Sequence, residues 1–345
     1  MTSLKKFYIS IIQTQHAKMI TKSTFAIYTS VPLRWLYHKQ DARFKKALRA
    51  IIHFFYSLFS RQKIGGHYAV TRSLLRGLTL NKIDYIYNPN TSIIDTTLVL
   101  SGIDTLKFAI HQKRRGKIKF LLAGPNISVL PSFDSNILAA KEIDICLVPS
   151  QWVKEAYEKD CPELIGRIKI WAAGIDETYW FPVKPHTIRN RALIYLKNEN
   201  APIKDVKKLL DTMHIPYDIL RYGKYTKQQY RELLSLSRFA IFLSQSESQG
   251  IALAEAWAMD VPTFSWNPGE FVYKMHTFKN VSSAPYTTSE NGALWKDIDE
   301  LYCVLDLFLK ENTYSPRKWI LNNMTDILCS KQLLSLIYNN PCNKQ

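Results

Sequence analysis

Two glutamates, Glu247 and Glu255, lie in a segment whose residue types suit a charged, hydroxyl-rich ligand. The segment contains an apolar run ending at Leu243, a polar loop, Gly250 and then a helical pattern that begins with small residues. Carboxylates accept hydrogen bonds from hydroxyl groups, and a hydrogen bond to a charged group contributes about 1.5–3 kcal/mol. Glu255, one turn into the helix, suits a ribose diol, and Glu247 suits the other end of the same ligand.

The expected helix after Gly250 adds a group that can bind phosphate. The first turn of a helix has N–H groups without helical partners and the positive end of the dipole, and both attract phosphate oxygens. Gly250 has no side chain, so a ligand could approach the backbone closely. We therefore expect the N–H groups of Gln249, Gly250 and Ile251 to hold a diphosphate between the two glutamates, which is the layout of a nucleotide-sugar.

Strands and helices alternate along most of the chain, which indicates an α/β protein with parallel sheets covered on both faces. The expected strands are 82–88, 97–101, 117–123, 143–148 and 167–172 in the first half and 192–196, 217–222, 239–243 and 261–266 in the second. The expected helices include 67–78, 151–159, 203–213, 227–235, 250–259 and 297–309. The first strand is either 25–30 or 51–56.

The segment 247–262 resembles the E-x7-E motif of GT-B glycosyltransferases, most of which retain the anomeric configuration of the sugar. In that family a Gly follows the first Glu and an E-A-x-A-x-x-x-P run begins at the second, as it does here. Weaker similarities lie at 65–66, 148–150 and 174–176. The resemblance implies that Glu247 contacts the donor sugar and Glu255 the ribose.

The same resemblance implies a fold and a division into domains. We expect two doubly wound, Rossmann-like domains facing a cleft, because a chain of 345 residues suits two cores. Residues 1–180 would form the acceptor-side domain and include a basic segment, 1–63. Residues 181–345 would bind the nucleotide-sugar, and the final helices would cross back to the first domain.

Further candidate residues flank the expected strands. The family places an Arg and a Lys after the first strand of the second domain to balance the diphosphate, which points to Lys197 and, with different spacing, to Arg191. Gly65 and Gly66 precede a helix and could approach the diphosphate or the sugar. The loop after the strand ending near residue 101 would line the acceptor side.

The expected chemistry requires neither a metal nor a cofactor. Lys197 and the helix N–H groups would stabilise the departing nucleotide diphosphate. If the enzyme retains configuration, as the resemblance implies, the diphosphate itself can assist removal of the acceptor proton. If it inverts, a base is needed, and the candidate is Asp104. The string Asp297-Ile298-Asp299 opens a predicted helix and implies no metal.

The net charge of +17 is concentrated at the start of the chain. Residues 1–63 contain twelve Lys or Arg against one acid, and 42–59 can form a basic amphipathic helix. That helix fits packing on the protein's own core or contact with an anionic membrane surface. Five scattered cysteines and the lack of an apolar run near 20 residues suggest a cytoplasmic protein, with peripheral association at the inner membrane face as the second hypothesis.

Two alternative functions remain open at this stage. A nucleotide-sugar epimerase has the same fold but needs extra carboxylates and histidines for elimination chemistry. A basic protein that binds nucleic acid or other anions would suit the isoelectric point near 9.5, but the chain contains no recognised nucleic-acid motif, so no nucleic acid is expected. The expected partners are a nucleotide-sugar donor and a glycan, lipid-linked or small-molecule acceptor.

Overall fold

The computed structural model describes residues 24–30, 66–89, 93–183, 188–273, 275–311 and 313–339. The chain forms two compact units. The first contains residues 1–148, 157–171 and 330–345, and the second contains 149–156 and 172–329. Helices α5 and α11 therefore contribute residues to both units, whereas the sequence analysis placed one main boundary after residue 180. Each unit is described separately.

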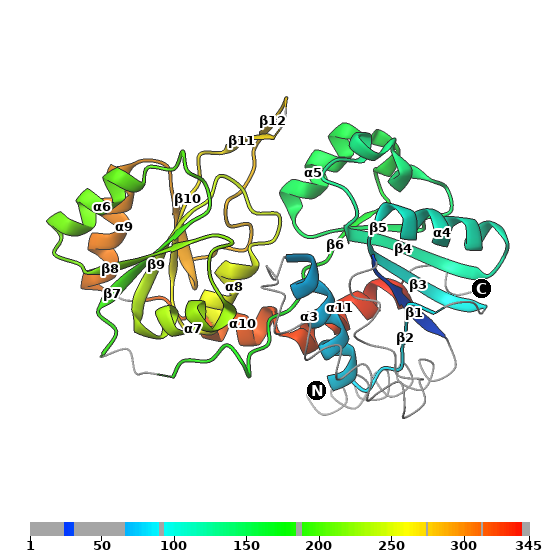
Figure 1. Ribbon diagram of the computed structural model, residues 1–345, viewed down its shortest axis with the longest axis horizontal. Coiled ribbons are helices and arrows are strands. Elements are labelled where there is room, and N and C mark those ends of the chain that lie inside the picture. Colours follow the sequence, from blue (N-terminus) through cyan, green and yellow to red (C-terminus); the bar gives the residue numbers. More distant parts are fainter. Residues whose placement is uncertain are drawn as a thin grey trace, which may run out of the picture. The chain divides into compact units, whose positions relative to one another are not determined.

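The first unit contains a six-stranded parallel sheet in the order β2-β1-β3-β4-β5-β6 (Figure 1). Its strands are β1 (Phe25–Tyr28), β2 (Ile86–Tyr87), β3 (Ile94–Ser101), β4 (Ile118–Asn126), β5 (Ile145–Val148) and β6 (Ile168–Ile170). Its longer helices are α3 (Gly66–Leu80), α4 (Ile103–Arg114), α5 (Gln151–Asp160) and α11 (Asp326–Tyr338). Short 3-10 turns lie at Pro131–Asp134, Ile137–Ala139 and Pro162–Leu164. The central strands are buried, as apolar strands covered on both faces should be.

The second unit contains a five-stranded parallel sheet in the order β13-β10-β9-β7-β8. Its strands are β7 (Arg191–Leu196), β8 (Tyr217–Arg221), β9 (Ser237–Leu243), β10 (Thr263–Trp266) and β13 (Gly292–Trp295). Its helices are α6 (Ile203–Thr212), α7 (Lys227–Leu236), α8 (Ile251–Ala258), α9 (Ile298–Lys310) and α10 (Pro316–Asn323). A separate antiparallel pair consists of β11 (Glu270–Tyr273) and β12 (His276–Lys279).

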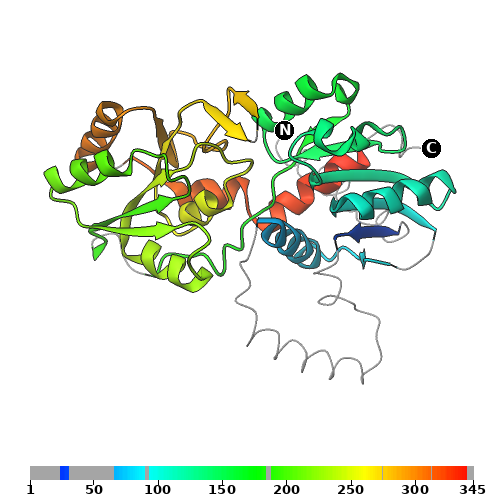
Figure 2. The same cartoon turned by 45° about the horizontal axis from the view of Figure 1, so that its top comes forward.

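Two apolar cores cover the two faces of the second sheet. Side chains of β7 alternate between them: Ile194 packs with residues of α6 and α9, and Tyr195 packs with residues of α7, α8 and α10. Figure 2 shows these two groups of helices around the sheet. This alternation is what a strand with period two produces when both faces are buried.

The strands expected from the sequence are present, with boundaries that shift by a few residues. The first strand is β1, Phe25–Tyr28, and the alternative at 51–56 lies outside the described residues. Three strands were not predicted, β11, β12 and β13, because each has only four residues and none shows a long apolar run.

Helix α9 begins after Asp297, whose carboxylate accepts a hydrogen bond from the Glu300 N–H at 2.9 Å. The acids of the Asp297-Ile298-Asp299 string therefore belong to a helix cap, as the sequence predicted. Most of the basic segment 1–63, including 42–59, lies outside the described residues. In the part of the chain that is described, no helix has both the length and the apolar character needed to cross a bilayer.

Candidate functional site in the second unit

The order of strands in the second sheet creates a place for a ligand between β7 and β9. The chain passes from β7 to β8 on one side, and then to β9 on the other side of β7. The connections after β7 and β9 therefore diverge, and α/β sheets bind ligands at the carboxyl ends of strands at such a reversal. Lys197 follows β7 directly, and the loop 244–250 follows β9. The Lys197 and Asn198 N–H groups both donate to the Leu243 carbonyl, at 3.0 and 3.2 Å.

An ion pair joins these two connections. The Lys197 Nζ lies 2.8 Å from Oε1 of Glu247, and the Ser244 hydroxyl donates to the same oxygen at 3.1 Å. The exposed fractions of the Lys197 and Glu247 side chains are 29% and 18%. The structure thus brings together two predicted residues, and Lys197 also lies 5.3 Å from the ring centre of Tyr222. A cation and a carboxylate are both accessible at the reversal point.

Main-chain hydrogen bonds hold Glu247 in place. Its N–H donates to the Ser282 carbonyl at 2.9 Å, and its carbonyl accepts from Nε1 of Trp152, a residue of the second unit, at 2.9 Å. The Gln245 N–H donates to the Asn198 side-chain oxygen at 3.0 Å. The sequence analysis missed the supporting residues Asn198 and Ser244, although each is a polar residue at or next to a strand end, which is the signal that could have found them.

Helix α8 begins at this loop without a side-chain cap. Gly250, its N-cap residue, has φ 80° and ψ 52°, and no side chain accepts a hydrogen bond at this helix end. The left-handed conformation favours glycine, and a Cβ there would lie 2.7 Å from Cδ1 of Leu253. The turn therefore requires a glycine here, whether or not a ligand approaches the backbone as the sequence suggested. The uncapped first turn, which includes Ile251, can donate to an anion.

The side chain of Gln249 has a structural role. It is 5% exposed, accepts from the Ala173 N–H at 3.0 Å and donates to the Ala173 carbonyl at 2.7 Å. This two-point contact fixes the residue before Gly250. Only the backbone N–H of Gln249 remains for the anion-binding role expected from the sequence.

Glu255 lies half-buried on α8 above a cluster of tyrosines. The Tyr195 and Tyr225 hydroxyls are 2.8 Å apart, and the Tyr230 hydroxyl donates to the carbonyl of Ala252 in the first turn of α8 at 2.7 Å. Tyr230 thereby ties α7 to the start of α8. The cluster supports the helix that carries Glu255.

Beyond the effect of burial, both glutamates raise the pKa of the same two phenols, those of Tyr225 and Tyr230. Burial raises the pKa of Tyr225, and the Glu255 and Glu247 carboxylates raise it further. Burial also raises the pKa of Tyr230 well above its usual value, with added contributions from Tyr225, Glu255 and Glu247. Both carboxylates disfavour the anionic form of these phenols, which stay protonated at neutral pH.

Two arginines fix the far end of α8. Arg189 is 2% exposed, and its guanidinium donates to the Met259 carbonyl at 3.0 Å. Arg317 donates to the Ala258 carbonyl and to the Trp180 carbonyl. Cations at the carboxyl end of a helix complement its dipole and its unpaired carbonyls.

Arg191 does not belong to this group of residues. It is the first residue of β7, and its guanidinium donates to both carboxylate oxygens of Asp218, at 2.7 and 3.1 Å. Lys197 follows the other end of the same strand, roughly 20 Å away at about 3.3 Å per residue. The prediction of Arg191 as a donor-binding residue is corrected for this reason: it stands at the amino end of the sheet, in a cross-strand ion pair.

The sequence also predicted site residues in the first unit. These lie at the carboxyl edge of the first sheet or outside the described residues. Asp104 is in the first turn of α4, after β3, with a fully exposed side chain and Lys107 at 3.9 Å. Gly66 is the first residue of α3 and is exposed, with nothing within 4 Å of where a Cβ would be. Gly65 lies outside the described residues. In the described part of the chain, the Asp104 carboxylate pairs with the exposed Lys107, which would not orient it as a base.

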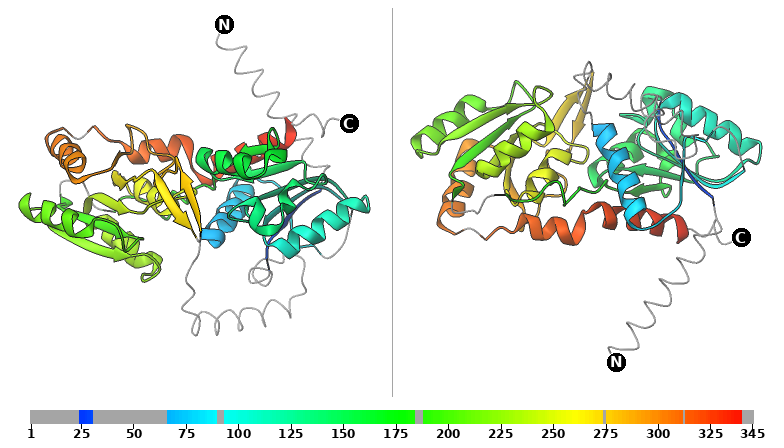
Figure 3. Two further views of the ribbon diagram at one scale, coloured as in Figure 1. Left: turned by 90° about the horizontal axis from the view of Figure 1, so that it is seen from above. Right: turned by 60° about the horizontal axis from the view of Figure 1, so that its bottom comes forward.

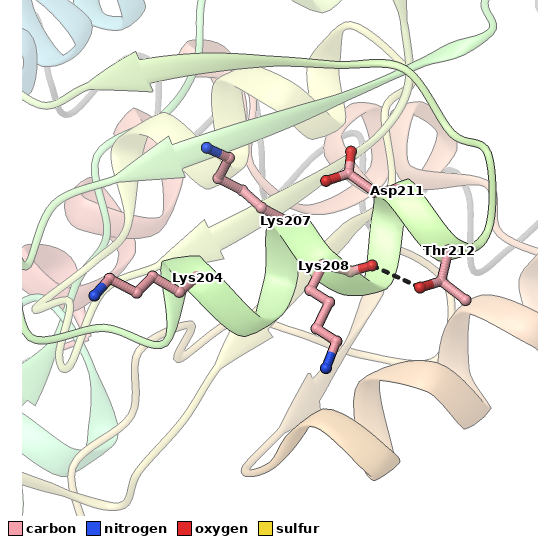
Figure 4. A pocket seen from close by; sticks show the side chains of 5 residues that line it. All are labelled: Lys204, Lys207, Lys208, Asp211 and Thr212. Carbon is pink, nitrogen blue, oxygen red and sulfur yellow. Dashed lines mark hydrogen bonds between the residues drawn. The ribbon is translucent and has the colours of Figure 1, made fainter.

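A shallow hollow of about 560 Å³ lies elsewhere in the second unit, on α6. It is lined by Lys204, Lys207, Lys208, Asp211 and Thr212. Figure 4 shows that the three lysine side chains point in different directions, so they do not converge on one ligand atom. Among the described residues, no group of three or more His, Cys, Asp or Glu side chains is arranged to hold a metal ion.

Comparison with known proteins assigns the fold. No family model matches the sequence, and no curated protein matches it. Among solved structures, the apo form of the lipopolysaccharide outer core galactosyltransferase WaaB matches with a TM-score of 0.57 and 12% identity, covering 91% of this chain and 99% of that chain. A structure of the GtfA/B complex matches with a TM-score of 0.50 and 13% identity, covering 73% of this chain and 58% of that one. With its parallel sheets and alternating helices, the chain has the GT-B, Rossmann-like fold.

Proposed function

We propose that this chain is a glycosyltransferase that binds a nucleotide-sugar donor at the carboxyl end of the second sheet. The Lys197–Glu247 ion pair beside the uncapped start of α8 carries the proposal, because it places a cation, a carboxylate and helix N–H donors at the strand reversal. The fold supports it, since a galactosyltransferase is among the solved structures that share this architecture. Glu255 on α8 supplies a second carboxylate for a diol.

In this proposal, the diphosphate of the donor lies over the first turn of α8. The N–H groups of Gly250 and Ile251 and the ammonium of Lys197 stabilise the negative charge that grows as the nucleotide diphosphate leaves. Glu247 then exchanges part of its contact with Lys197 for a hydroxyl of the transferred sugar. Glu255 accepts hydrogen bonds from the ribose diol.

We further propose that the transfer retains the anomeric configuration and needs no metal. Lys197 and the helix N–H groups provide positive charge at the leaving group, which is the role that a divalent cation has in other phosphate chemistry. With retention, an oxygen of the leaving diphosphate takes the proton of the acceptor hydroxyl, so Asp104 is not required as a base. The acceptor is proposed to be a glycan or a lipid-linked saccharide.

A donor screen tests the proposal. Thermal shifts are measured with UDP-, GDP-, ADP- and CMP-sugars, and the rate of donor hydrolysis is measured for each hit. We expect one nucleotide to raise the melting temperature, since a ligand that binds only the folded state stabilises it. NMR of the transferred sugar then gives its anomeric configuration. A chain that binds none of these donors or their free diphosphates would remove the basis for the proposal.

The two alternative functions have less support. The side-chain contacts that Glu247 makes are with Lys197 and Ser244, and neither is the carboxylate or histidine that epimerase elimination chemistry needs. The basic segment that suggested nucleic-acid binding lies mostly outside the described residues. Heparin and DNA binding across a salt series, compared with stabilisation by nucleotide diphosphates, separates these functions from the proposed one.

A further inference from the structure

The β11–β12 hairpin is an exposed ribbon that the proposed transfer reaction does not use. In the described part of the chain its two strands pair only with each other. Figures 2 and 3 show it as a separate ribbon beside the five-stranded sheet of its unit. An isolated two-stranded ribbon is marginally stable by itself, so its retention as an exposed element needs an explanation.

The tip of the hairpin is apolar on more than one side. Met275 at the turn is 97% exposed, and Val272 is 60% exposed. On the face opposite Val272, Tyr273 is 36% exposed, and its ring stacks on that of Phe271 with centroids 6.2 Å apart. A surface that binds one sugar ring or one flat partner needs an apolar patch on a single face. Apolar groups on both faces and at the tip suit insertion into a medium that surrounds the element.

The charges of the hairpin are compatible with an anionic surface. Residues 270–279 contain two lysines against one glutamate, and the whole chain has a net charge of +17. The glutamate, Glu270, lies at the base of the ribbon, where it faces Lys279 in the register of the strands. No acidic residue lies between 271 and 279, so no carboxylate would have to leave water, and Lys274, which lies between Tyr273 and Met275 in the sequence, would keep its ammonium at the lipid headgroups, so only the apolar side chains enter the apolar layer.

We propose that the β11–β12 hairpin inserts its tip into the surface of an anionic lipid bilayer. Val272, Tyr273 and Met275 leave water, while the base of the ribbon, with Lys279, stays at the headgroups, where basic residues are attracted. Insertion is shallow, because the outer edges of a two-stranded ribbon carry backbone N–H and C=O groups that need water or headgroup partners.

The base of the hairpin adjoins the candidate site. The Val281 N–H donates to the Gly269 carbonyl at 3.3 Å, and the next residue, Ser282, accepts from the Glu247 N–H at 2.9 Å. A membrane that holds the hairpin would therefore hold the Glu247 loop near its surface. If the proposed function is correct, the acceptor is a saccharide carried on a membrane lipid, and this consequence alone rests on that function.

Flotation of the full chain with vesicles tests the insertion. Vesicles of phosphatidylcholine with phosphatidylglycerol are compared with vesicles of phosphatidylcholine alone, without any donor. We expect binding to the anionic vesicles, and a loss of about tenfold or more for Val272→Asp or Met275→Asp, since burial of one apolar side chain contributes about that factor. Leu307→Asp is the matched control, because Leu307 on α9 is also 60% exposed, and it should bind as the unchanged chain does.

Several outcomes would overturn the inference. If the tip variants float as the unchanged chain does, the binding does not depend on the hairpin, and the inference is rejected. Failure of the unchanged chain to float also rejects it. Light scattering that shows a dimer, reduced to a monomer by Val272→Asp with vesicle binding unaltered, would assign the hairpin to self-association instead.

A fluorescent label locates the tip directly. Met275→Cys is labelled with an environment-sensitive dye after Cys303→Ser and Cys342→Ser, and Lys279→Cys in the same background is the control. We expect a blue shift with anionic vesicles at 275 and little at 279; equal shifts or none would contradict insertion by the tip. Nucleoside diphosphate binding by the tip variants, measured without vesicles, should be unchanged. Vesicle binding without diphosphate binding would reject the proposed function and leave the inserted hairpin standing.

Discussion

The two units have the same plan of parallel strands but differ where the strand order reverses. In the first unit the reversal lies between β1 and β3, where the Ser30 and Ser101 hydroxyls are 3.3 Å apart. In the second it lies between β7 and β9, where Lys197 and Glu247 form an ion pair supported by a third residue, Ser244. One reversal has a pair of hydroxyls with the exposed Asp104 and Lys107 on the helix that follows, and the other has a partly buried ion pair, so the two suit different ligands.

This difference shows that the fold fixes where a ligand can bind, while the residues after each strand decide what it is. A diphosphate needs positive charge and N–H donors, and those lie in the second unit. The small hydroxyls of the first unit suit an uncharged, hydroxyl-bearing group such as a sugar acceptor. Five sets of variants test this difference between the units.

The largest expected effect is on turnover at the charged reversal. Glu247→Gln and Lys197→Ala should each lower kcat by about a hundredfold or more, the usual cost of one preorganised group that stabilises the transition state. Asp104→Asn, in the first unit, should change kcat by less than about threefold if the reaction retains configuration. Rates with the donor identified by the screen provide the measurement, and a large loss with Asp104→Asn would instead favour inversion with a protein base.

The next effect is on donor affinity. Glu255→Gln should weaken binding of the free nucleoside diphosphate by about tenfold to a hundredfold, because a charged hydrogen-bond acceptor for the ribose is lost. Titration calorimetry measures this affinity. Glu311→Gln, at the carboxyl end of α9 and so at the other end of that helix from the strand ends, serves as the control. Equal affinities for Glu255→Gln and Glu311→Gln would remove Glu255 from the site.

Each unit contains an arginine whose guanidinium donates hydrogen bonds to main-chain carbonyls. The contribution of this arginine to the free energy of unfolding can therefore be compared between the units. Arg167 in the first unit donates to the Ala139, Ala140 and Ile143 carbonyls, and Arg317 in the second holds the end of α8. Replacement of either arginine by Ala should lower the free energy of unfolding by about 2 kcal/mol, since carbonyls lose their partners. Urea unfolding measures this loss. Only Arg317→Ala should also weaken diphosphate binding, and an equal weakening by both would contradict the link to α8.

Two glycines with positive φ give a smaller, matched pair. Gly250 in the second unit has φ 80°, and Gly166 in the first has φ 84° with nothing within 4 Å of a Cβ position. An alanine at either position should cost about 1–2 kcal/mol of backbone strain, and at position 250 its Cβ would also press on Cδ1 of the buried Leu253 and add to that cost. Gly250→Ala should in addition reduce diphosphate affinity, because it alters the start of α8. Thermal unfolding and calorimetry on both variants separate the two effects, and unchanged affinity would remove Gly250 from the anion site.

The smallest expected effect is on acid stability in the first unit. A hydrogen bond from Lys119 lowers the pKa of Asp95, and the backbone and hydroxyl of Thr24 contribute to the same shift. The stabilisation is therefore present above the unfolded value of about 3.9 and is lost as pH falls through the lower folded value. Asp95→Asn should be slightly less stable than the unchanged chain at pH 7, by under about 1 kcal/mol, and should approach it near pH 2. Urea midpoints at both pH values test the sign.

The sequence predicted the strands of both sheets except β13, with β1 as one of two alternatives, because buried parallel strands are continuous apolar runs, as in β7 and β9. It also predicted the loop and helix around Gly250. It misplaced Arg191, since order along the chain does not show that a residue at the start of a strand lies at the opposite edge from one at its end. The side-chain role of Gln249 depends on Ala173, which is distant in sequence and therefore invisible to local patterns.

The β11–β12 hairpin was not predicted for a different physical reason. Its strands are four residues long and exposed on both faces, so they show no alternation of apolar and polar residues. The Lys197–Glu247 contact depends on β7 and β9 being neighbours in the sheet, although β8 lies between them along the chain. Strand order is a tertiary property, and single-sequence patterns do not report it.

The hydrogen bond from the Glu247 amide to Ser282 has a consequence for the speed and cost of binding. Because the fold itself holds the backbone of this acid through this hydrogen bond, the loss of conformational entropy occurs during folding and is not repeated with each ligand. Glu247 can therefore meet its ligand by a change of side-chain partner alone. Turnover on this scaffold would then be limited by events other than the ordering of this loop.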